Sequence, residues 1–259
     1  MSHSLAVRDE ALRALRAAGC VFAEDELAVL CEAAAGDDQR LRELTGRRVV
    51  GEPLEQVIGW ADFCGVRVTV RPGVFVPRPR TRVLVEAAVP YAEAGGLVVD
   101  LCCGSGAVGL AVRRRVPAVV LVAADLEPRA VACARENLAG IGEVYEGDLF
   151  AALPAAVRGR VGVLLANVPY VPTRHLPLMP AEAREFEPEV ALDGGEDGLD
   201  VFRRVAWEAS VWLAPGGVVL SECAESQVGA ATEALRRNGL RAEVVTDDEL
   251  EATAVLGHR

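Results

Sequence analysis

Leucines recur at helical spacing over the first 50 residues, with charged side chains between them. Glycines at positions 19, 36 and 46 interrupt the pattern and divide it into separate helices. A unit of 50 residues is too small to bury a large core alone, so we expect a helical domain that rests on the rest of the chain. The leucines in this pattern are Leu5, Leu12, Leu15, Leu27, Leu30, Leu41 and Leu44.

The pattern then changes to a period of two, which is typical of β-strands. Residues 63–70 alternate, Arg71–Gly73 has the composition of a turn, and Val74–Val76 is apolar again. We therefore predict a β-hairpin with its turn at Arg71–Gly73. Pro77-Arg78-Pro79 ends this segment and leads into a helix from Thr81 to Val89.

From Leu97 onward, continuous apolar runs alternate with amphipathic segments. This alternation predicts a mainly parallel sheet covered by helices on both faces, an α/β fold. Two runs near the end are separated by only a few residues, which permits an antiparallel hairpin but not a crossover. The runs are Leu97–Leu101, Val119–Ala123, Val161–Leu165, Gly217–Leu220, Arg241–Thr246 and Ala252–Leu256, and the helices include Glu127–Ala139 and Leu199–Leu213.

Composition and charge exclude several classes of protein. The chain is 51% hydrophobic and 25% charged, as expected of a globular protein, and its net charge is −11. Such a surface repels phosphate backbones, so we expect no direct nucleic-acid binding, although Arg78, Arg80 and Arg82 form one candidate basic patch. We find neither a signal peptide nor an apolar run of about 18 residues. We expect a cytoplasmic monomer that does not bind membranes.

The seven cysteines argue against both a disulfide framework and a metal site. Their number is odd, and no two are spaced as Cys-x-x-Cys. We therefore expect reduced thiols and no bound metal.

A glycine-rich loop follows the first apolar run of the sheet and enters a helix. It contains Cys102, Cys103, Gly104, Ser105 and Gly106. Gly104 and Gly106 permit a tight turn and close approach of the backbone to a ligand. Alone, this pattern also fits the pyrophosphate site of a dinucleotide.

Three acidic residues near the ends of successive strands favour a different ligand, S-adenosylmethionine. Asp100, just before the glycine loop, would repel a pyrophosphate but suits the cationic amino-acid end of this methyl donor. Asp125 lies 21 residues after Gly104, as expected of a carboxylate that accepts both ribose hydroxyls. We expect Asp148 to bind the adenine amino group, with Leu149 against the ring. The product would be S-adenosylhomocysteine.

A short loop, Asn167-Val168-Pro169-Tyr170, follows the fourth strand of the sheet. The carboxamide oxygen of an Asn and a neighbouring backbone C=O accept the two N–H bonds of a planar NH2 group. An aromatic ring then lies against its plane. At the ligand-binding edge of the sheet, this loop predicts chemistry on an amide or amino nitrogen.

Together these motifs resemble the HemK/PrmC family of protein glutamine methyltransferases. The resemblance covers nearly the whole chain and places it in a divergent branch of that family. It includes Gly51–Gly59, Val76–Pro79, the glycine loop, Asn167–Tyr170, Glu187-Pro188, Asp193–Leu199, Pro215–Gly217, Glu222 and Gln227.

The resemblance implies a class I methyltransferase fold, with a seven-stranded sheet and an antiparallel C-terminal hairpin. It implies a recognition domain at 1–50, a linker with a hairpin at 51–79 and a catalytic domain at 80–259. The implied reaction methylates the side-chain amide of a glutamine in a protein, a release factor or another translation protein. The chain departs from the family at Val168, a usual proline, at Cys102, a usual glycine, and at Arg80, a usual acid.

The mechanism predicted from the residues relies on positioning. An amide nitrogen is a poor nucleophile because its lone pair is delocalised into the carbonyl. We expect Asn167 and the C=O of Val168 to hold it in line with the methyl group, with Tyr170 packed against the amide or the donor. His175 is the nearest imidazole, and we interpret it as a surface residue.

Three alternatives use the same fold. A nucleic-acid methyltransferase uses such a loop on the exocyclic amine of a flipped base. An enzyme of small molecules would methylate a free amide or amine. A third possibility is a donor-binding protein that only contacts a partner.

Overall fold

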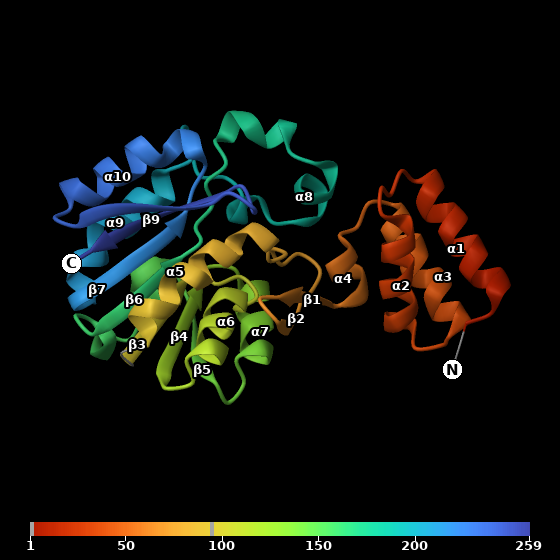
Figure 1. Cartoon of the computed structure of the whole chain (residues 1–259), viewed down its shortest axis with the longest axis horizontal. Coiled ribbons are helices and arrows are strands. Elements are labelled where there is room, and N and C mark those ends of the chain that lie inside the picture. Colours follow the sequence, from red (N-terminus) through yellow and green to blue (C-terminus); the bar gives the residue numbers. More distant parts are fainter. Residues whose placement is uncertain (1–2, 94–95) are drawn as a thin grey trace.

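The computed structural model describes residues 3–93 and 96–259, which form a helical lobe and a larger α/β lobe (Figure 1). Helices are present in the N-terminal part as predicted, with one correction: Gly46 does not divide two helices but lies inside α3. They pack around leucines that have no exposed surface, among them Leu15, Leu30 and Leu41. Their bounds are α1 (Leu5–Ala17), α2 (Ala23–Ala34), α3 (Asp38–Val49) and the short α4 (Leu54–Ile58).

Local capping fixes where two of these helices begin. The hydroxyl of Ser4 accepts the N–H of Val7, and the carboxylate of Asp37 accepts two N–H groups of the first turn of α3. Val57 of α4 packs into the same core as the longer helices. The division of the chain at residues 50 and 79 stays a prediction.

A β-hairpin follows the helical lobe, but its turn is not where the sequence pattern placed it. The strands are β1 (Trp60–Phe63) and β2 (Val66–Thr69), paired antiparallel. The turn is Cys64-Gly65, where φ is 50° and 78°. Two positive φ values in a two-residue loop are typical of the type I′ turn, which matches the twist of a hairpin.

The prediction of a strand at Val74–Val76, paired across a hairpin turn at Arg71–Gly73, was therefore wrong. A turn is present there, since the N–H of Val74 donates to the C=O of Arg71 at 3.0 Å, but residues 74–76 form no strand. Residues 74–76 use their backbone groups differently. The C=O of Val74 accepts a bond from the side chain of Gln56, and the N–H of Val76 donates to the carboxylate of Glu187. Long-range side-chain partners replace the strand pairing that alternation alone suggested.

Seven strands within the described ranges form one sheet, which confirms the predicted fold class. Their order across the sheet is β5-β4-β3-β6-β7-β9-β8, and only the pairs that involve β9 are antiparallel. The bounds are β3 (Gly96–Leu101), β4 (Val119–Asp125), β5 (Gly142–Glu146), β6 (Val161–Ala166), β7 (Leu213–Glu222), β8 (Arg241–Asp247) and β9 (Ala252–His258).

Helices cover both faces of this sheet, as continuous apolar strands require. Successive strand residues point to opposite faces, so Val98 and Val99 belong to different core clusters. One cluster includes side chains of α5 (Arg82–Ala92), α6 (Ala107–Arg115) and α7 (Pro128–Asn137). The other includes side chains of α9 (Asp200–Trp212) and α10 (Val228–Arg237).

The remaining connections contain short helices, most of them 3-10 turns. A long segment between β6 and α9 holds several of them and lies beside the helical lobe. There Glu182 makes an ion pair with Arg48 of α3, with an N–O distance of 3.2 Å. These elements are η1 (Pro79–Thr81), η2 (Leu149–Ala152), η3 (Ala155–Val157), η4 (Thr173–Leu178), α8 (Ala181–Phe186), η5 (Glu189–Ala191) and η6 (Glu225–Gln227).

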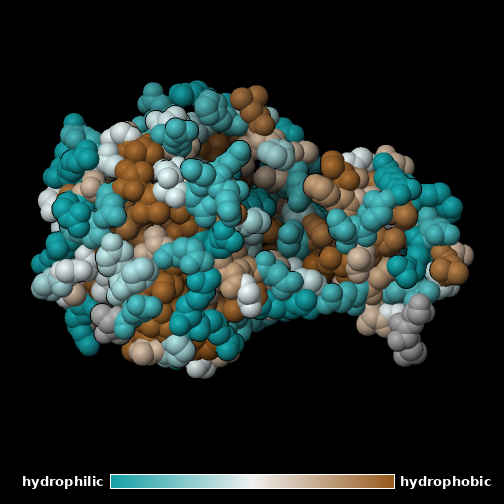
Figure 2. Space-filling model, viewed as in Figure 1, coloured by the Kyte–Doolittle hydropathy of each residue, from teal (hydrophilic) through white to brown (hydrophobic). Residues whose placement is uncertain are grey.

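The surface of the molecule is indented between the two lobes. Hydrophobic side chains line part of that indentation on the face shown in Figure 2, and other hydrophobic areas lie among hydrophilic residues over the larger lobe. Within residues 3–93 and 96–259, no helix combines the length and the apolar character that crossing a bilayer requires.

Candidate active site

A cavity lies at the carboxyl ends of β3, β4, β5 and β6, where open α/β sheets bind ligands. It brings together residues that are far apart in the sequence. Gly106 does not line it; this residue begins α6 behind the cavity, beside Ala134 and Leu138. The predicted residues that line the cavity are Asp100, Cys102, Cys103, Gly104, Ser105, Asp125, Asp148, Leu149, Asn167, Val168, Pro169 and Tyr170.

The glycine loop is fastened to the neighbouring strand by Asp125. One carboxylate oxygen of Asp125 accepts the N–H of Gly104 at 2.8 Å, and the other accepts the N–H of Glu127 at 2.9 Å. Burial raises the pKa of Asp125, although these two hydrogen bonds lower it. Each carboxylate oxygen keeps a further lone pair for a ligand hydroxyl.

Asp100 is the most buried acid of the cavity, with 1% of its surface exposed. Its carboxylate accepts the N–H of Gly109, in the first turns of α6, at 2.8 Å. Burial raises the pKa of Asp100 to about 7, and the nearby charge of Asp125 adds to this shift. A cation placed against Asp100 would favour its ionised form and reverse the shift.

Asp148 is half exposed and pairs with Arg204 of α9, at an N–O distance of 2.6 Å. Arg204 also lines the cavity, although no pattern in the sequence indicated a role for it. Its position on a helix that begins 52 residues after Asp148 offers no local signal. Leu149 lies beside Asp148 with φ 49° and contributes an apolar wall.

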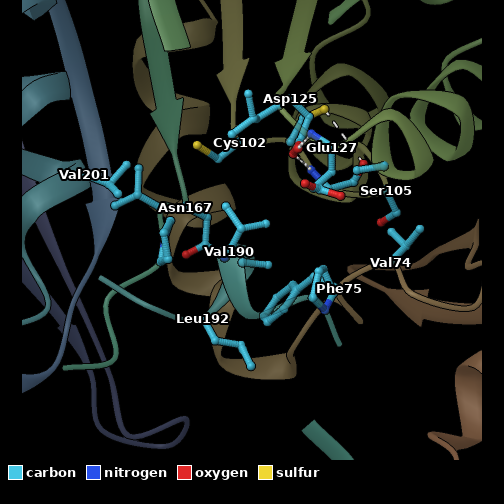
Figure 3. A pocket seen from close by; sticks show the side chains of 18 of the residues that line it. Val74, Phe75, Cys102, Ser105, Asp125, Glu127, Asn167, Val190, Leu192 and Val201 are labelled. Carbon is cyan, nitrogen blue, oxygen red and sulfur yellow. Dashed lines mark hydrogen bonds between the residues drawn. The ribbon is translucent and has the colours of Figure 1, made fainter. Parts of the chain in front are cut away.

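Asn167 carries the most informative polar atom of the site. Its carboxamide oxygen is buried and has no hydrogen-bond partner among the described residues. Figure 3 shows this side chain pointing into the cavity, with Cys102 and Val201 on one side and Phe75, Val190 and Leu192 on the other. Buried polar atoms are nearly always paired, so an orphaned acceptor that faces a cavity indicates a ligand with an N–H or O–H group.

The backbone around Asn167 is held by a second loop that must contain glycine. A Cβ at Gly198 would overlap the carbonyl oxygen of Tyr170, and one at Gly194 would overlap that of Pro169. The side-chain NH2 of Gln227 donates to the same Tyr170 carbonyl at 2.8 Å. This contact gives a physical reason for the Asp193–Leu199 motif of the sequence.

Val168, which replaces the usual proline of the family, belongs to the loop Asn167–Tyr170. The Val168 side chain is buried in the core cluster that includes α9 and α10.

An ion pair between Arg78 and Glu187 joins the segment after the hairpin to the long segment before α9. Nη2 of Arg78 lies 2.7 and 2.6 Å from the two oxygens of Glu187, whose side chain has no exposed surface. The N–H of Val76 donates to the same carboxylate at 3.1 Å. Burial raises the pKa of Glu187, and Arg78 opposes that shift.

Tyr170 is held by polar side chains that the sequence analysis did not assign to the site. Its hydroxyl donates to Glu222 at 2.8 Å and accepts from Arg80 at 2.6 Å. Glu222 is 3% exposed and also accepts the hydroxyl of Thr81 at 2.7 Å. Burial and the carboxylate of Glu222 raise the pKa of Tyr170 above its usual range. Sequence separations of 52 to 141 residues explain why spacing did not reveal this cluster.

The structure provides no basic patch at Arg78, Arg80 and Arg82, because each pairs with an acid. Arg80 pairs with Glu222, and Arg82 lies 3.5 Å from Asp247. His175 is exposed and does not line the cavity. Among the described residues, no group of three or more His, Cys, Asp or Glu side chains is arranged to hold a metal ion.

Comparison with known proteins agrees with this geometry. Residues 65–177 match the family described as "Methyltransferase small domain". A release factor glutamine methyltransferase of Streptomyces coelicolor is 40% identical over 197 residues, which cover 74% of this chain and 70% of the relative. A second relative, from Streptomyces pristinaespiralis, is a 4-amino-L-phenylalanine/4-methylamino-L-phenylalanine methyltransferase. It is 34% identical over 81% of this chain and 77% of its own length.

The fold is shared more widely than the sequence. The crystal structure of the ribosomal protein L11 methylase from Lactobacillus delbrueckii subsp. bulgaricus superimposes with a TM-score of 0.53 at 17% identity. The match covers 73% of this chain and 83% of the other. The sheet order and the relatives at 34–40% identity lead to one conclusion. This chain belongs to the family of the release factor glutamine methyltransferases and has the class I methyltransferase fold.

Proposed function

We propose that the protein transfers a methyl group from S-adenosylmethionine to the side-chain amide nitrogen of a glutamine in a protein substrate, a translation release factor. The observation that carries this proposal is the orphaned oxygen of Asn167 in a cavity at the carboxyl edge of the sheet. Membership of the family supports the same reaction, because the Streptomyces coelicolor relative is named for it.

The residues of the cavity fit the donor. Asp100 offers a buried carboxylate for the ammonium of the amino-acid end, and Asp125 offers free lone pairs for the ribose hydroxyls. Asp148 and Leu149 offer a carboxylate and an apolar wall for the adenine. When bound, S-adenosylmethionine supplies an electrophilic methyl group on a sulfonium.

The chain contributes positioning to the reaction. Asn167 accepts one N–H of the substrate amide through its orphaned oxygen, and the C=O of Val168 accepts the other. The nitrogen lone pair is thereby held toward the methyl group, and binding supplies the entropy of alignment before the chemical step. Gly194, Gly198 and Gln227 maintain the loop in this shape.

Tyr170 acts as a wall of the acceptor site. Its hydroxyl is already bonded to Glu222 and Arg80, and its raised pKa keeps it protonated, so it is not available as a base. The methylated nitrogen is strongly acidic, so its proton leaves without a dedicated base. This assignment keeps all four residues Asn167–Tyr170 in the acceptor site.

The relative from Streptomyces pristinaespiralis supports a second candidate, a small-molecule amine as the acceptor. That protein is named for methylation of 4-amino-L-phenylalanine, and its similarity covers 81% of this chain. An arylamine NH2 is planar enough for the same pair of acceptors on Asn167 and Val168.

One experiment separates these candidates. The purified protein is incubated with methyl-labelled S-adenosylmethionine and either a release factor or 4-amino-L-phenylalanine. A release factor with its acceptor glutamine replaced by alanine serves as the control. Label in the glutamine side chain, absent from the control, supports the proposal. Label in the free amino acid alone would overturn the protein substrate.

A further inference from the structure

Arg80 stands on the wall between the active-site cavity and a second cavity. It lines both, together with Tyr170, and its side chain is 50% exposed. The site as described so far gives this cation no task beyond its contacts with Glu222 and Tyr170. Its contact with Tyr170 places it at the acceptor side of the cavity, which Asn167 also lines.

The guanidinium of Arg80 is held in one orientation. Its Nε lies 2.9 Å from an oxygen of Glu222, and its Nη2 donates to the hydroxyl of Tyr170 at 2.6 Å. These contacts use two of the five N–H groups of a guanidinium. The other three have no hydrogen-bond partner within residues 3–93 and 96–259. A guanidinium that is already oriented loses little conformational freedom when it binds a further acceptor.

The charges around Arg80 indicate the side from which this acceptor approaches. The second cavity is lined by Glu225, Asp247, Asp248 and Glu251, which repel an electron-rich oxygen. The acids of the active-site cavity, Asp100, Asp125, Glu127 and Asp148, lie at or just beyond the ends of β3, β4 and β5. The residues of the acceptor loop that line it, Asn167 to Val171, are neutral. An oxygen acceptor is therefore favoured on the substrate side of the wall.

We infer that Arg80 is a specificity-determining residue that binds a main-chain oxygen of the substrate while Asn167 binds its amide. This inference rests on the proposed function. A glutamine places its main-chain carbonyl about 5 Å from its amide nitrogen, so two groups that line one cavity can bind the two ends of the same residue. In a peptide the acceptor is a carbonyl; in a free amino acid it is a carboxylate.

Compensation of the negative charge on Glu222 does not by itself explain why Arg80 keeps N–H groups unpaired among the described residues. The Glu222 carboxylate already accepts hydroxyl groups from Tyr170 and Thr81, and its contact with Arg80 leaves most guanidinium donors unused. A purely compensating role and a binding role therefore predict different behaviour when both charges are removed together.

The test compares Arg80→Gln with the double variant Arg80→Gln/Glu222→Gln. Arg82→Gln is the matched control, because Arg82 is the next arginine along the chain and lines neither cavity. Calorimetry measures the Kd of a glutamine-containing peptide for enzyme saturated with S-adenosylhomocysteine, and steady-state assays measure KM and kcat. Both Arg80 variants are expected to raise Kd and KM about tenfold, as loss of a charge-assisted hydrogen bond does, with kcat within about threefold. Arg82→Gln is expected to bind as the wild type does.

Wild-type Kd in the double variant would overturn the inference, because Arg80 would then only compensate Glu222. A fall in kcat at unchanged KM would overturn it as well. Wild-type enzyme that neither binds nor methylates any glutamine acceptor would overturn the proposed function, and the inference with it. Methylation by the wild type with no difference in the Arg80 variants would overturn the inference alone.

Three acceptors identify the oxygen that Arg80 binds. Butyramide has an amide but no main-chain oxygen, so wild type and Arg80→Gln should methylate it with kcat/KM values within twofold. N-acetylglutamine carries a carboxylate, and its N-methylamide carries only a carbonyl. A loss confined to the carboxylate assigns Arg80 to a free amino acid, and an equal loss for both assigns it to a peptide. A loss with butyramide would contradict both assignments.

Discussion

The two halves of the active site are built in different ways. The donor half consists of the glycine loop with Asp100, Asp125 and Asp148, and each of these acids already has a protein partner. Two of the three are fixed by backbone N–H groups within 21 residues. The acceptor half consists of Asn167–Tyr170 and the segments packed around it. Its polar contacts span 52 to 141 residues, and it contains a buried oxygen without a partner.

The difference shows that the acceptor half, where the substrate amide would bind, contains a hydrogen-bond acceptor with no partner among the described residues. A donor site with paired acids is preformed and stable before any ligand arrives. An unpaired buried acceptor costs about 1–3 kcal/mol, so it persists only where surrounding contacts hold it in place. The long-range ion pairs and glycine contacts around Asn167 supply that support.

The largest expected effect is the loss of turnover in Asn167→Ala. Removing one positioned hydrogen-bonding group from an active site typically costs about 100- to 1000-fold in kcat. The Kd of S-adenosylmethionine, measured by calorimetry, should stay within about threefold, because the donor half is held by other residues. Chemical denaturation should give a free energy of unfolding equal to that of the wild type or about 1 kcal/mol higher, since an unpaired buried oxygen is removed.

The combination of lost activity and unreduced stability is the signature of a functional atom. Asn137→Ala is a matched control, because its side chain makes three strong bonds to Thr69 and Ser105 and should lose stability instead. Wild-type kcat in Asn167→Ala would show that the acceptor half does not bind the substrate amide.

Arg78→Ala should destabilise the acceptor half while leaving the donor half intact. It leaves the fully buried carboxylate of Glu187 without its partner, and removal of one member of a buried ion pair lowers the free energy of unfolding by about 3 kcal/mol. Hydrogen exchange should become faster in residues 171–193 and 74–78 and stay unchanged in the glycine loop. The double variant Arg78→Ala/Glu187→Gln should recover part of the loss. Equal acceleration in both halves would mean that they unfold as one unit.

The pH dependence of S-adenosylmethionine binding tests the donor half of the site. Asp100 has a pKa of about 7 without ligand, and a bound ammonium requires its ionised form. Donor affinity should therefore fall up to about tenfold for each pH unit below 7, and Asp100→Asn should bind weakly with a flatter profile. Calorimetry between pH 5 and 8 measures both, and parallel profiles in the two proteins would exclude Asp100 as the titrating group.

The same shift predicts a stability effect of defined sign. A carboxyl whose folded pKa is about 7 binds more protons in the folded than in the unfolded chain between about pH 4 and 7. Its contribution to stability therefore falls as the pH rises through that window. The measured unfolding free energy of the wild type minus that of Asp100→Asn should therefore be smaller at pH 8 than at pH 5.

The halves also differ in how far the sequence predicts them. Asp100, Asp125 and the glycine loop follow from local rules, because strand ends and glycine turns lie close together in the chain. The position of Asn167 in the cavity was predicted in the same way, because this residue also follows the end of a strand of the sheet. Glu222, Arg204 and Glu187 could not be assigned, since their partners are distant residues brought together only by packing. The misplaced hairpin turn has the same origin. The C=O of Val74 and the N–H of Val76 bond to the side chains of Gln56 and Glu187, not to a neighbouring strand.

The smallest expected effect concerns Cys102, where the donor half itself carries strain. Its φ of 53° lies in the left-handed region, which costs a non-glycine residue about 1 kcal/mol. Cys102→Gly should therefore raise the free energy of unfolding by about that amount, with donor affinity within about threefold. Cys103→Gly is the control: this buried neighbour lacks a positive φ, so the same substitution should destabilise the protein. If both variants lose stability alike, the Cys102 side chain contributes packing that outweighs its backbone strain, and the donor half depends on its side chains as the acceptor half does.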